Sequence, residues 1–592
     1  MDLDRLTDEF PAPEYRGNQA AALDAIDEAF AAGNEVVLVR APTGSGKSLL
    51  ARAIAGCARR PGAADPEEPV GAYYTTPQVS QLDDVSNDPL LDDLAIVRGK
   101  NNYDCILPGE STTPVDRAPC VREREFECDR KQRCPYYSDR SIASQRSIAA
   151  MTLAYFMQTA GSDVFGQRDV IVVDEAHGLR EWAELYATIE LDPSTVPVWE
   201  ARPPPAIDDL GSARSYADGL RTVCERRLTE LRNQAELDPD AVVERDRLET
   251  LRSDLGWFLE TSGPVGPGEG AAGDDGDTDG ESDADDDSGG TEWVVHQPDG
   301  AGEPVRIAPM NPERYLGHTV WDRGQQFALL SATILDKDAF CRGVGLDPDR
   351  VALVSVGHTF PVESRPLFDV SAGKMTREHR ADTLDTIADT VVRIMADRPD
   401  EPGLIHCHSY DIQSGLADRL RERGVADRIR AHGRSDRDAQ LATWKRETRP
   451  EVFLSVKMEE ALDLEGDLAR WQVLCKAPYP NVGDPRVERR LENDRWDWYY
   501  RTALRTVIQA CGRIVRSPTD YGATYLADRS LLDLFDRARS AMPEWFAAQV
   551  DRCERPDLPP GDASAALAGL SGGGTDRRTV DASPVADVWD TD

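Results

Sequence analysis

The chain has 592 residues, 40% of them hydrophobic, and its 107 acidic against 68 basic residues give a formal net charge of −39. This length allows about four domains of roughly 150 residues each, while no stretch reaches the roughly 18 uninterrupted apolar residues of a membrane helix. The acidic N-terminus lacks the apolar core of a secretory signal. Composition therefore argues against a membrane or secreted protein and predicts a cytoplasmic one without a membrane partner.

The acidity has two explanations: a protein that avoids polyanions, or a halophilic protein adapted to a salt-saturated cytoplasm. Arginine far exceeds lysine, and acidic residues occur in almost every segment, which favours the second explanation. Because molar salt screens charges over roughly 3 Å, the net charge does not exclude nucleic acid as a partner. Residues 117–140, which contain three of the 11 cysteines, and residues 486–516 hold more basic than acidic side chains.

A strand, a glycine-rich loop and a helix are predicted near the N-terminus, which is the opening of a nucleotide-binding α/β unit. The strand is EVVLVR at 35–40, and the loop APTGSGKS fits the pattern GxxxxGK[ST] except that alanine replaces the first glycine. Its backbone N–H groups can cradle phosphate, the lysine can reach the β- and γ-phosphates, and the serine can hold Mg²⁺. The predicted nucleotide-binding residues are Ala41, Pro42, Thr43, Gly44, Ser45, Gly46, Lys47 and Ser48.

A second apolar run, at 169–173, ends in the tetrapeptide DEAH. Asp174 would position Mg²⁺, and Glu175 would orient and deprotonate the attacking water. His177 is a candidate for coupling the nucleotide site to the rest of the protein. A third apolar run, at 327–330, ends in SATI.

Residues 181–262 are rich in Leu, Arg and Glu, with apolar positions at helical spacing, which predicts helices. The next segment, 263–292, is acidic and glycine-rich, and no Lys or Arg occurs between Arg252 and Arg306. Such a segment cannot bury a core, so we predict that it is disordered. We predict the same for the tail that begins at residue 556.

Apolar runs at 402–407, 451–456 and 471–475 predict a second α/β unit. Strands that alternate with helices favour parallel sheets, with the chemistry at the carboxyl ends of the strands. Each of these two units would therefore carry its polar motifs along one edge of its sheet.

QACGRIVR, which starts at Gln509, carries two arginines, Arg513 and Arg516, three residues apart on one predicted helix face. Two guanidinium groups so placed can reach a γ-phosphate as arginine fingers. The preceding segment RWDWYYRTALRT, at 495–506, is either a stacking platform for bases or helix core; we favour helix core, with Arg505 as a candidate for DNA contact.

The ordered series of phosphate loop, DEAH, SAT and QxxGRxxR resembles the motifs of superfamily 2 helicases, which have two RecA-like domains. YRGNQ, at 15–19, is similar to their adenine-sensing motif, with Arg16 and Gln19 at the matching positions. EALDLEGD, at 460–467, resembles the EGxDxxGD pattern of the second domain, and the match implies that Asp463 lies at the nucleotide. Ala461 departs from that pattern by replacing the glycine.

KAPYPNVGDP, at 476–485, resembles a segment of one subgroup, the XPD/DinG iron–sulfur DNA helicases. Its members carry a four-cysteine cluster domain between the phosphate loop and DEAH, and GKNNYDC and CPYY are similar to the segments with the first and last ligands. The resemblance implies four ligands: Cys105, Cys120, Cys128 and Cys134. Four thiolates suit a 4Fe–4S cluster or zinc, and the absence of CxxC pairs favours the cluster.

The expected fold class is therefore α/β: two RecA-like parallel-sheet motor domains, with an iron–sulfur insertion and a helical arch-like insertion in the first. Motor domain 1 would comprise residues 1–100, 141–180 (with DEAH) and 316–355 (with SAT). The iron–sulfur insertion would span 101–140 and the arch-like insertion 181–315. Motor domain 2 would span 356–555, followed by a disordered tail at 556–592.

The resemblance implies an ATP-dependent DNA helicase that translocates 5′→3′ on single-stranded DNA in repair or replication-associated processing. ATP, Mg²⁺ and a 4Fe–4S cluster would be its cofactors, and single-stranded and forked DNA its partners, with repair proteins as further candidates. We expect a monomer associated with the nucleoid. The alternative is an ATP-gated DNA-binding scaffold of a repair complex, without processive unwinding; the intact pair Asp174/Glu175 argues against it.

Overall fold

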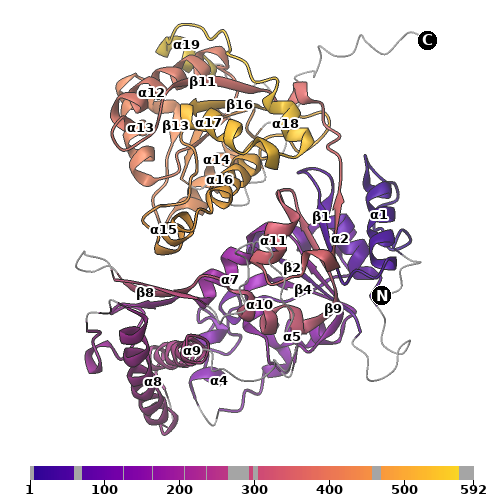
Figure 1. Ribbon diagram of the computed structural model, residues 1–592, viewed down its shortest axis with the longest axis vertical. Coiled ribbons are helices and arrows are strands. Elements are labelled where there is room, and N and C mark those ends of the chain that lie inside the picture. Colours follow the sequence, from indigo (N-terminus) through magenta and orange to yellow (C-terminus); the bar gives the residue numbers. More distant parts are fainter. Residues whose placement is uncertain are drawn as a thin grey trace, which may run out of the picture.

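The computed structural model describes residues 6–571 apart from 59–69, 124–125, 163, 206, 208, 235–236, 264–291, 298–303, 457–463 and 465–467. The core of the predicted acidic loop and Asp463 lie outside the described residues. Figure 1 shows two lobes, one above the other, with a pair of long helices at the side of the lower lobe. No helix in the described part of the chain is long and apolar enough to cross a membrane.

The lower lobe is built on a seven-stranded sheet in which all paired strands are parallel. In spatial order its strands are β10 (Val351–Ser355), β1 (Val36–Arg40), β9 (Gly324–Ser331), β5 (Arg168–Val173), β2 (Ala72–Thr76), β4 (Ile148–Thr152) and β3 (Ala95–Ile96). Both faces of the sheet are buried, because alternate residues of each strand enter two separate apolar clusters. This explains why its strands are continuous apolar runs in the sequence.

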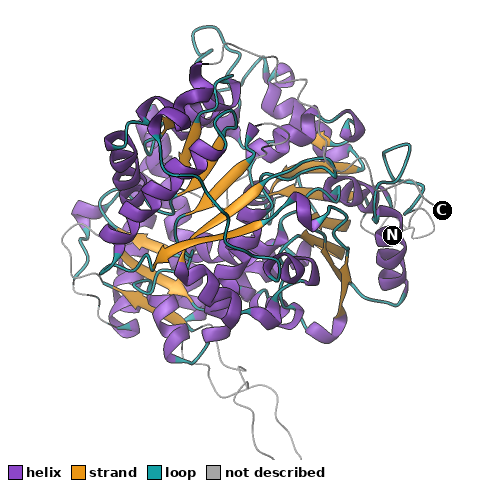
Figure 2. Cartoon of the chain, turned by 90° about the horizontal axis from the view of Figure 1, so that it is seen from above, coloured by secondary structure: helices purple, strands orange, loops and turns teal. Residues whose placement is uncertain are grey.

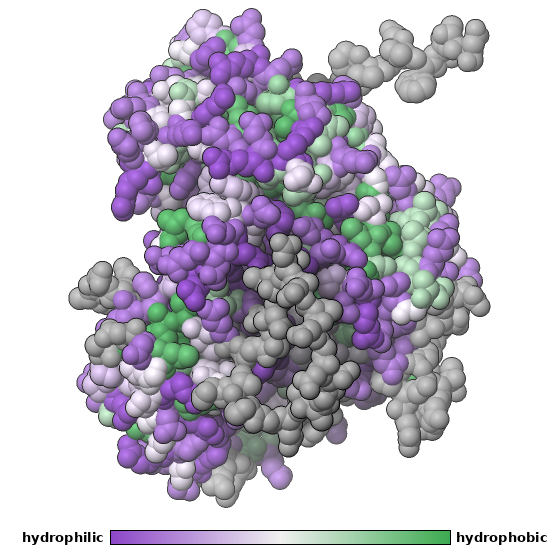
Figure 3. Space-filling model, viewed as in Figure 1, coloured by the Kyte–Doolittle hydropathy of each residue, from purple (hydrophilic) through white to green (hydrophobic). Residues whose placement is uncertain are grey.

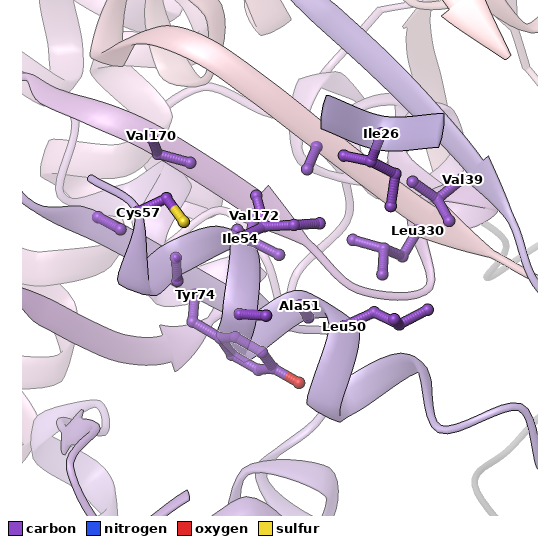
Figure 4. Packing of buried hydrophobic residues seen from close by; sticks show 14 of the residues in the cluster. Ile26, Val39, Leu50, Ala51, Ile54, Cys57, Tyr74, Val170, Val172 and Leu330 are labelled. Atoms are coloured by element: carbon purple, nitrogen blue, oxygen red, sulfur yellow. The ribbon is translucent and has the colours of Figure 1, made fainter. Parts of the chain in front are cut away.

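Helices cover both faces of this sheet (Figure 2). On one face, α1 (Gln19–Ala31) and α2 (Lys47–Gly56) contribute Ile26, Leu50 and Ile54 to a cluster that also contains Val39 and Val172 (Figure 4). On the other face lie α6 (Leu153–Gln158), α7 (Leu179–Ala187), α10 (Glu313–Thr319) and α11 (Lys337–Gly343). The helix α3 (Val79–Asn87) follows β2 and packs on the same cluster as α2.

The upper lobe is built on a six-stranded sheet, again with parallel pairing throughout. Its order is β11 (Leu367–Gly373), β16 (Ala523–Asp528), β15 (Trp471–Leu474), β12 (Gly403–His406), β14 (Val452–Ser455) and β13 (Ile429–Arg430). The helices are α12 (Arg380–Asp397), α13 (Tyr410–Glu422), α14 (Arg437–Arg446), α15 (Pro485–Glu492), α16 (Trp496–Cys511), α17 (Arg529–Arg537), α18 (Glu544–Val550) and α19 (Ala563–Ser571). Two parallel sheets with helical covers confirm the predicted α/β fold class.

The segment after α7 forms a subdomain with an apolar cluster of its own. Two long helices, α8 (Leu210–Arg232) and α9 (Pro239–Thr261), pack on an antiparallel sheet of β6 (Ile189–Leu191), β8 (Val305–Pro309) and β7 (Trp293–His296). Both helices begin at an aspartate whose side chain accepts a hydrogen bond from the first turn, Asp209 and Asp238. The segment is therefore helical as predicted but also contains strands.

The cysteine-containing segment between β3 and β4 has short helices and a small aromatic cluster instead of a sheet. It contains α4 (Pro119–Arg122) and α5 (Pro135–Gln145). Val115, Cys134 and Tyr136 form its buried centre. The backbone of Leu237, beside α9, donates to the carbonyl of Arg122 at 2.9 Å, which ties this segment to the two-helix subdomain.

The first part of the predicted disordered tail is ordered. Leu558 and Ala566 are buried in the core of the upper lobe, and α19 packs on α12. Arg428, which is also fully buried, donates to the carbonyl of Ala566 at 2.5 Å. The prediction of disorder from residue 556 is therefore wrong for 556–571, because this small-residue segment fits against a helix far away in the sequence.

Candidate active site

The phosphate loop lies between β1 and α2 and depends on two glycines with positive φ. Gly44 has φ 77° and Gly46 has φ 80°, a region that other residues rarely adopt. A Cβ on Gly44 would lie 2.4 Å from the Phe360 ring, and one on Gly46 would lie 2.1 Å from the Gln19 side chain. Gly46 caps α2 without a side-chain acceptor, so no side chain caps the first-turn N–H groups.

Gln19 fastens the start of the chain to this loop. Its side-chain oxygen accepts from the backbone N–H of Arg16 at 2.8 Å, and its amide nitrogen donates to the carbonyl of Ser45 at 3.1 Å. Gln19 is buried, whereas Arg16 is exposed. Of the two predicted adenine-sensing residues, Gln19 therefore contacts the loop directly.

The acidic pair lies opposite the loop, at the end of β5. The Lys47 ammonium is 3.5 Å from Oε1 of Glu175, and Nδ1 of His177 is 3.2 Å from Oε2 of the same carboxylate. Burial raises the pKa of Glu175, but Lys47, His177 and Arg513 outweigh it and hold that pKa well below its usual range. Burial and the neighbouring Glu175 carboxylate raise the pKa of Asp174.

The helix α16 of the upper lobe contacts the lower lobe along one face. Arg501 pairs with Asp336 at 2.9 Å, and Arg505, four residues later, pairs with Glu181 at 2.6 Å. Gln509, another four residues later, lies 2.5 Å from Nε2 of His177 and donates to Oγ1 of Thr333 at 3.2 Å. Spacing by four aligns these side chains on one face of the helix.

Beyond α16, the chain passes directly over the phosphate loop. A Cβ on Gly512 would lie 2.7 Å from Oγ1 of Thr43, and the Arg516 carbonyl lies against Gly44. The helix ends at Cys511, so Arg513 and Arg516 occupy a turn and not the helix face that the sequence predicted. Both still line the cavity described next.

A cavity of about 560 Å³ lies between the lobes, a size within the usual range for small-molecule sites. It is lined from the lower lobe by Thr43, Gly44, Gly46, Lys47, Ser48, Asp174, Glu175 and His177, and from the upper lobe by Arg505, Gln509, Arg513 and Arg516. Most predicted nucleotide-site residues thus meet at one place. Ala41, Pro42 and Ser45 contribute to the loop without lining the cavity.

Arg505 and the aromatic residues before it lie in other surroundings than the sequence predicted. Arg505 lines the cavity between the lobes and pairs with Glu181, so it is not a free DNA contact. Trp496 is 45% exposed, so the first turn of α16 is not helix core as predicted. Tyr74, a buried tyrosine beside Asp174 and Glu175, was not predicted as part of the site. The alternation of side chains along β2 is the signal that could have identified it.

The four predicted thiol ligands lie in the segment between β3 and β4. Cys105 and Cys134 are buried, and Cys120 and Cys128 are partly exposed. Burial raises the pKa of the Cys120 thiol, and the thiols of Cys128, Cys105 and Cys134 raise it further. Within the described ranges, no three His, Cys, Asp or Glu side chains are arranged to hold a metal ion.

Comparisons with known proteins agree with this architecture. The family model of the helicase C-terminal domain matches residues 391–549, and the DEAD_2 model matches residues 120–196. Human regulator of telomere elongation helicase 1 is 32% identical over 116 residues, which cover 17% of this chain and 9% of that protein. The ATP-dependent DNA helicase DinG of Photobacterium profundum is 23% identical over 261 residues, 41% of this chain and 37% of that protein.

In the matched segments this chain is therefore similar to helicases of the XPD/DinG type. Two solved structures share the fold of this chain. One is an XPD helicase, with a TM-score of 0.58 and 16% identity, and the match covers 92% of this chain and all of that one. The other is Xpd4 of S. tokodaii, with a TM-score of 0.52 and 15% identity, and the match covers 89% of this chain and 98% of that one. The matched segments span about a tenth to a third of the curated relatives' own lengths.

Proposed function

We propose that this XPD/DinG-type protein is an ATP-dependent DNA helicase that translocates 5′→3′ along single-stranded DNA and opens forked duplexes in repair or replication-associated processing. One observation carries the proposal: side chains of both lobes meet around the phosphate loop. Lys47 and Glu175 come from the lower lobe, and Gln509 reaches across to His177 from the upper one. A cavity divided between two lobes allows a nucleotide to change how they sit against each other.

The donor set at the loop suits magnesium-bound ATP. Ser48 and Asp174 would hold Mg²⁺ through the oxygen ligands that this ion prefers. The ion would neutralise charge that develops on the phosphates. Lys47 would bind the β- and γ-phosphates, and the loop N–H groups would orient them.

Binding of phosphate would also change Glu175. In this structure Lys47 faces the Glu175 carboxylate. When Lys47 turns to the phosphates, Glu175 loses part of the positive charge that holds its pKa low, and it becomes a better proton acceptor. Glu175 would then orient and deprotonate the attacking water, while Arg513 and Arg516 stabilise the transferring phosphoryl group.

The contact of Gln509 with His177 supports a route from hydrolysis to movement. His177 also contacts Oγ of Ser331 at 2.9 Å, at the end of β9. A proton or charge change at Glu175 therefore reaches both the SAT segment and the upper lobe through one imidazole. Repeated opening and closing of the cleft would move the lobes along a DNA strand.

The cysteine segment and the two-helix subdomain are proposed to contact DNA. Four cysteine thiols in one segment have the ligand chemistry of a 4Fe–4S cluster, with zinc as the alternative, and a cluster would hold together a segment with a small apolar core. Lys131 lies 4.8 Å from the centre of the Tyr137 ring, a pairing of cation and aromatic ring suited to a single strand. The two-helix subdomain would act as the arch that helps to enclose the strand.

A strand-displacement assay in molar KCl tests the proposal with duplexes that carry either a 5′ or a 3′ single-stranded tail. We expect ATP-dependent displacement from the 5′-tailed duplex alone. Displacement from the 3′-tailed duplex alone would show that the protein translocates 3′→5′ instead. DNA-stimulated hydrolysis without any displacement would favour the alternative, an ATP-gated scaffold of a repair complex.

A further inference from the structure

Two adjacent tyrosines in β2 are both almost fully buried but face opposite sides of the sheet. The Tyr73 hydroxyl donates to the carbonyl of Gly166 at 2.9 Å. Tyr74 faces the side covered by α2, where it packs among Leu50, Ala51 and Val172. In Figure 4 its ring lies beneath α2, and its hydroxyl points out of the apolar cluster toward the beginning of that helix.

The Tyr74 hydroxyl is buried without a hydrogen-bond partner of normal geometry among the described residues. Buried polar groups in folded proteins are almost always hydrogen-bonded, so an exception requires a reason. Its position suggests one. The side chain of Ser48, the residue proposed to hold Mg²⁺, interacts with this hydroxyl.

The geometry of the sheet explains why this hydroxyl meets the metal ligands. Tyr74 lies opposite Val172 in the neighbouring strand β5. Because side chains alternate along a strand, Asp174, two residues beyond Val172, lies on the same side of the sheet as Tyr74. The helix that covers this side starts at Lys47, so Ser48 lies in its first turn. Burial and the Asp174 carboxylate raise the pKa of Tyr74 well above its usual value, in agreement with this placement.

We propose that Tyr74 is a positioning residue of the magnesium site, whose hydroxyl donates to the Asp174 carboxylate when Mg²⁺ and nucleotide are bound. Oδ1 of Asp174 already accepts from the backbone N–H of Glu175 at 2.9 Å, which leaves Oδ2 for the phenol. A second hydrogen bond fixes the rotation of the carboxylate, as outer partners of metal ligands do. The inference rests on the proposed function, because it assumes that Ser48 and Asp174 hold Mg²⁺.

The proposal makes a paired prediction for the full-length protein, because Tyr74→Phe removes only an oxygen that lacks a partner in the metal-free state. We expect this variant to unfold at the wild-type temperature or above it without metal. We also expect it to need about tenfold more Mg²⁺ for half-maximal binding of a fluorescent ADP analogue. Tyr73→Phe is the matched control: it loses a formed hydrogen bond, so it should unfold at a lower temperature with an unchanged Mg²⁺ requirement.

Three results would overturn the inference: an unchanged Mg²⁺ requirement in Tyr74→Phe, an equal increase in Tyr73→Phe, or an equal loss of ADP binding by Tyr74→Phe with and without metal. The last would show that the ring only packs. Lys47→Ala, measured in parallel, tests the nucleotide site itself. If that variant bound the analogue normally, the proposed function would fail, whatever Tyr74 does.

Discussion

The Lys47 ammonium lies 3.5 Å from the Glu175 carboxylate, so the residue expected to bind phosphate is paired with the residue expected to activate water. In the proposed mechanism, ATP competes with Glu175 for Lys47. The pair therefore links occupation of the phosphate loop to the basicity of the carboxylate, since removal of the cation lets the pKa of Glu175 rise.

Glu175→Gln should separate binding from hydrolysis. The amide cannot accept the proton of water, so we expect DNA-stimulated ATPase to fall by about 10²–10⁴-fold. Nucleotide affinity should stay equal or increase, because Lys47 is released from its ion pair. Single-turnover hydrolysis and equilibrium nucleotide binding measure the two effects. Near-normal turnover would show that Glu175 is not the base.

Gln509→Ala should uncouple the lobes. The change removes the contacts with His177 and Thr333 but no group that we expect to touch the phosphates. We expect nucleotide binding to remain, while the stimulation of ATPase by DNA falls at least about tenfold, which corresponds to about 1.4 kcal/mol. Gln440→Ala is a suitable control, because that side chain contacts Arg430 and Asp436 within the upper lobe. Equal stimulation in both variants would contradict the coupling route.

Glu184→Ala should destabilise the contact between the lobes. The Glu184 carboxylate is buried and lies 2.6 Å from Arg490 of α15 and 2.8 Å from Arg180. Its removal leaves the buried Arg490 guanidinium without this carboxylate, at a cost of about 3–5 kcal/mol. Denaturant unfolding should reveal this loss. Arg489→Ala, on the same helix, breaks an exposed pair with Glu292 and should change little.

Asp254, in α9, predicts a pH dependence of the two-helix subdomain. Burial raises its pKa to about 7. Between about pH 4 and pH 7 the unfolded chain ionises this group while the folded protein keeps the proton, so stability falls as pH rises and then levels off. Asp254→Asn should remove that slope and stabilise the protein at pH 8 by about 1–2 kcal/mol, since partial exposure reduces the effect. If the free energies of unfolding of variant and wild type changed with pH in the same way across this range, the prediction would be refuted.

The four cysteines give a spectroscopic prediction. If Cys105, Cys120, Cys128 and Cys134 hold a 4Fe–4S cluster, protein purified without oxygen should be brown, with broad absorption near about 400 nm. Cys134→Ser should bleach it, and Cys57→Ser, in the core behind α2, should not. Nucleotide binding should survive the loss, because the lobe keeps its own apolar clusters. Colourless protein with about one zinc per chain would show that the thiols bind zinc instead of an iron–sulfur cluster.

The motifs that are local in the chain could be recognised from the sequence alone. The phosphate loop and DEAH are each a short run of consecutive residues that directly follows an apolar strand. Because both faces of these strands are buried, the strands are continuous apolar runs that can be recognised in the sequence. The α/β class followed from the same pattern. The end of α16 at Cys511 and the packed segment 556–571 were missed, because contacts with distant elements outweigh local propensity there.

Contacts between side chains that are distant in the sequence could not be predicted and depend on the three-dimensional fold. Gln509 and His177 are 332 residues apart in sequence, and Arg490 and Glu184 are 306 apart, yet each pair is in contact. The spacing within a motif cannot encode such a contact, because it depends on how two separately packed lobes dock. Tyr74 is the clearest case. Its sequence neighbours predict a buried strand residue, and only the register of β2 against β5 places it on the same side of the sheet as Asp174.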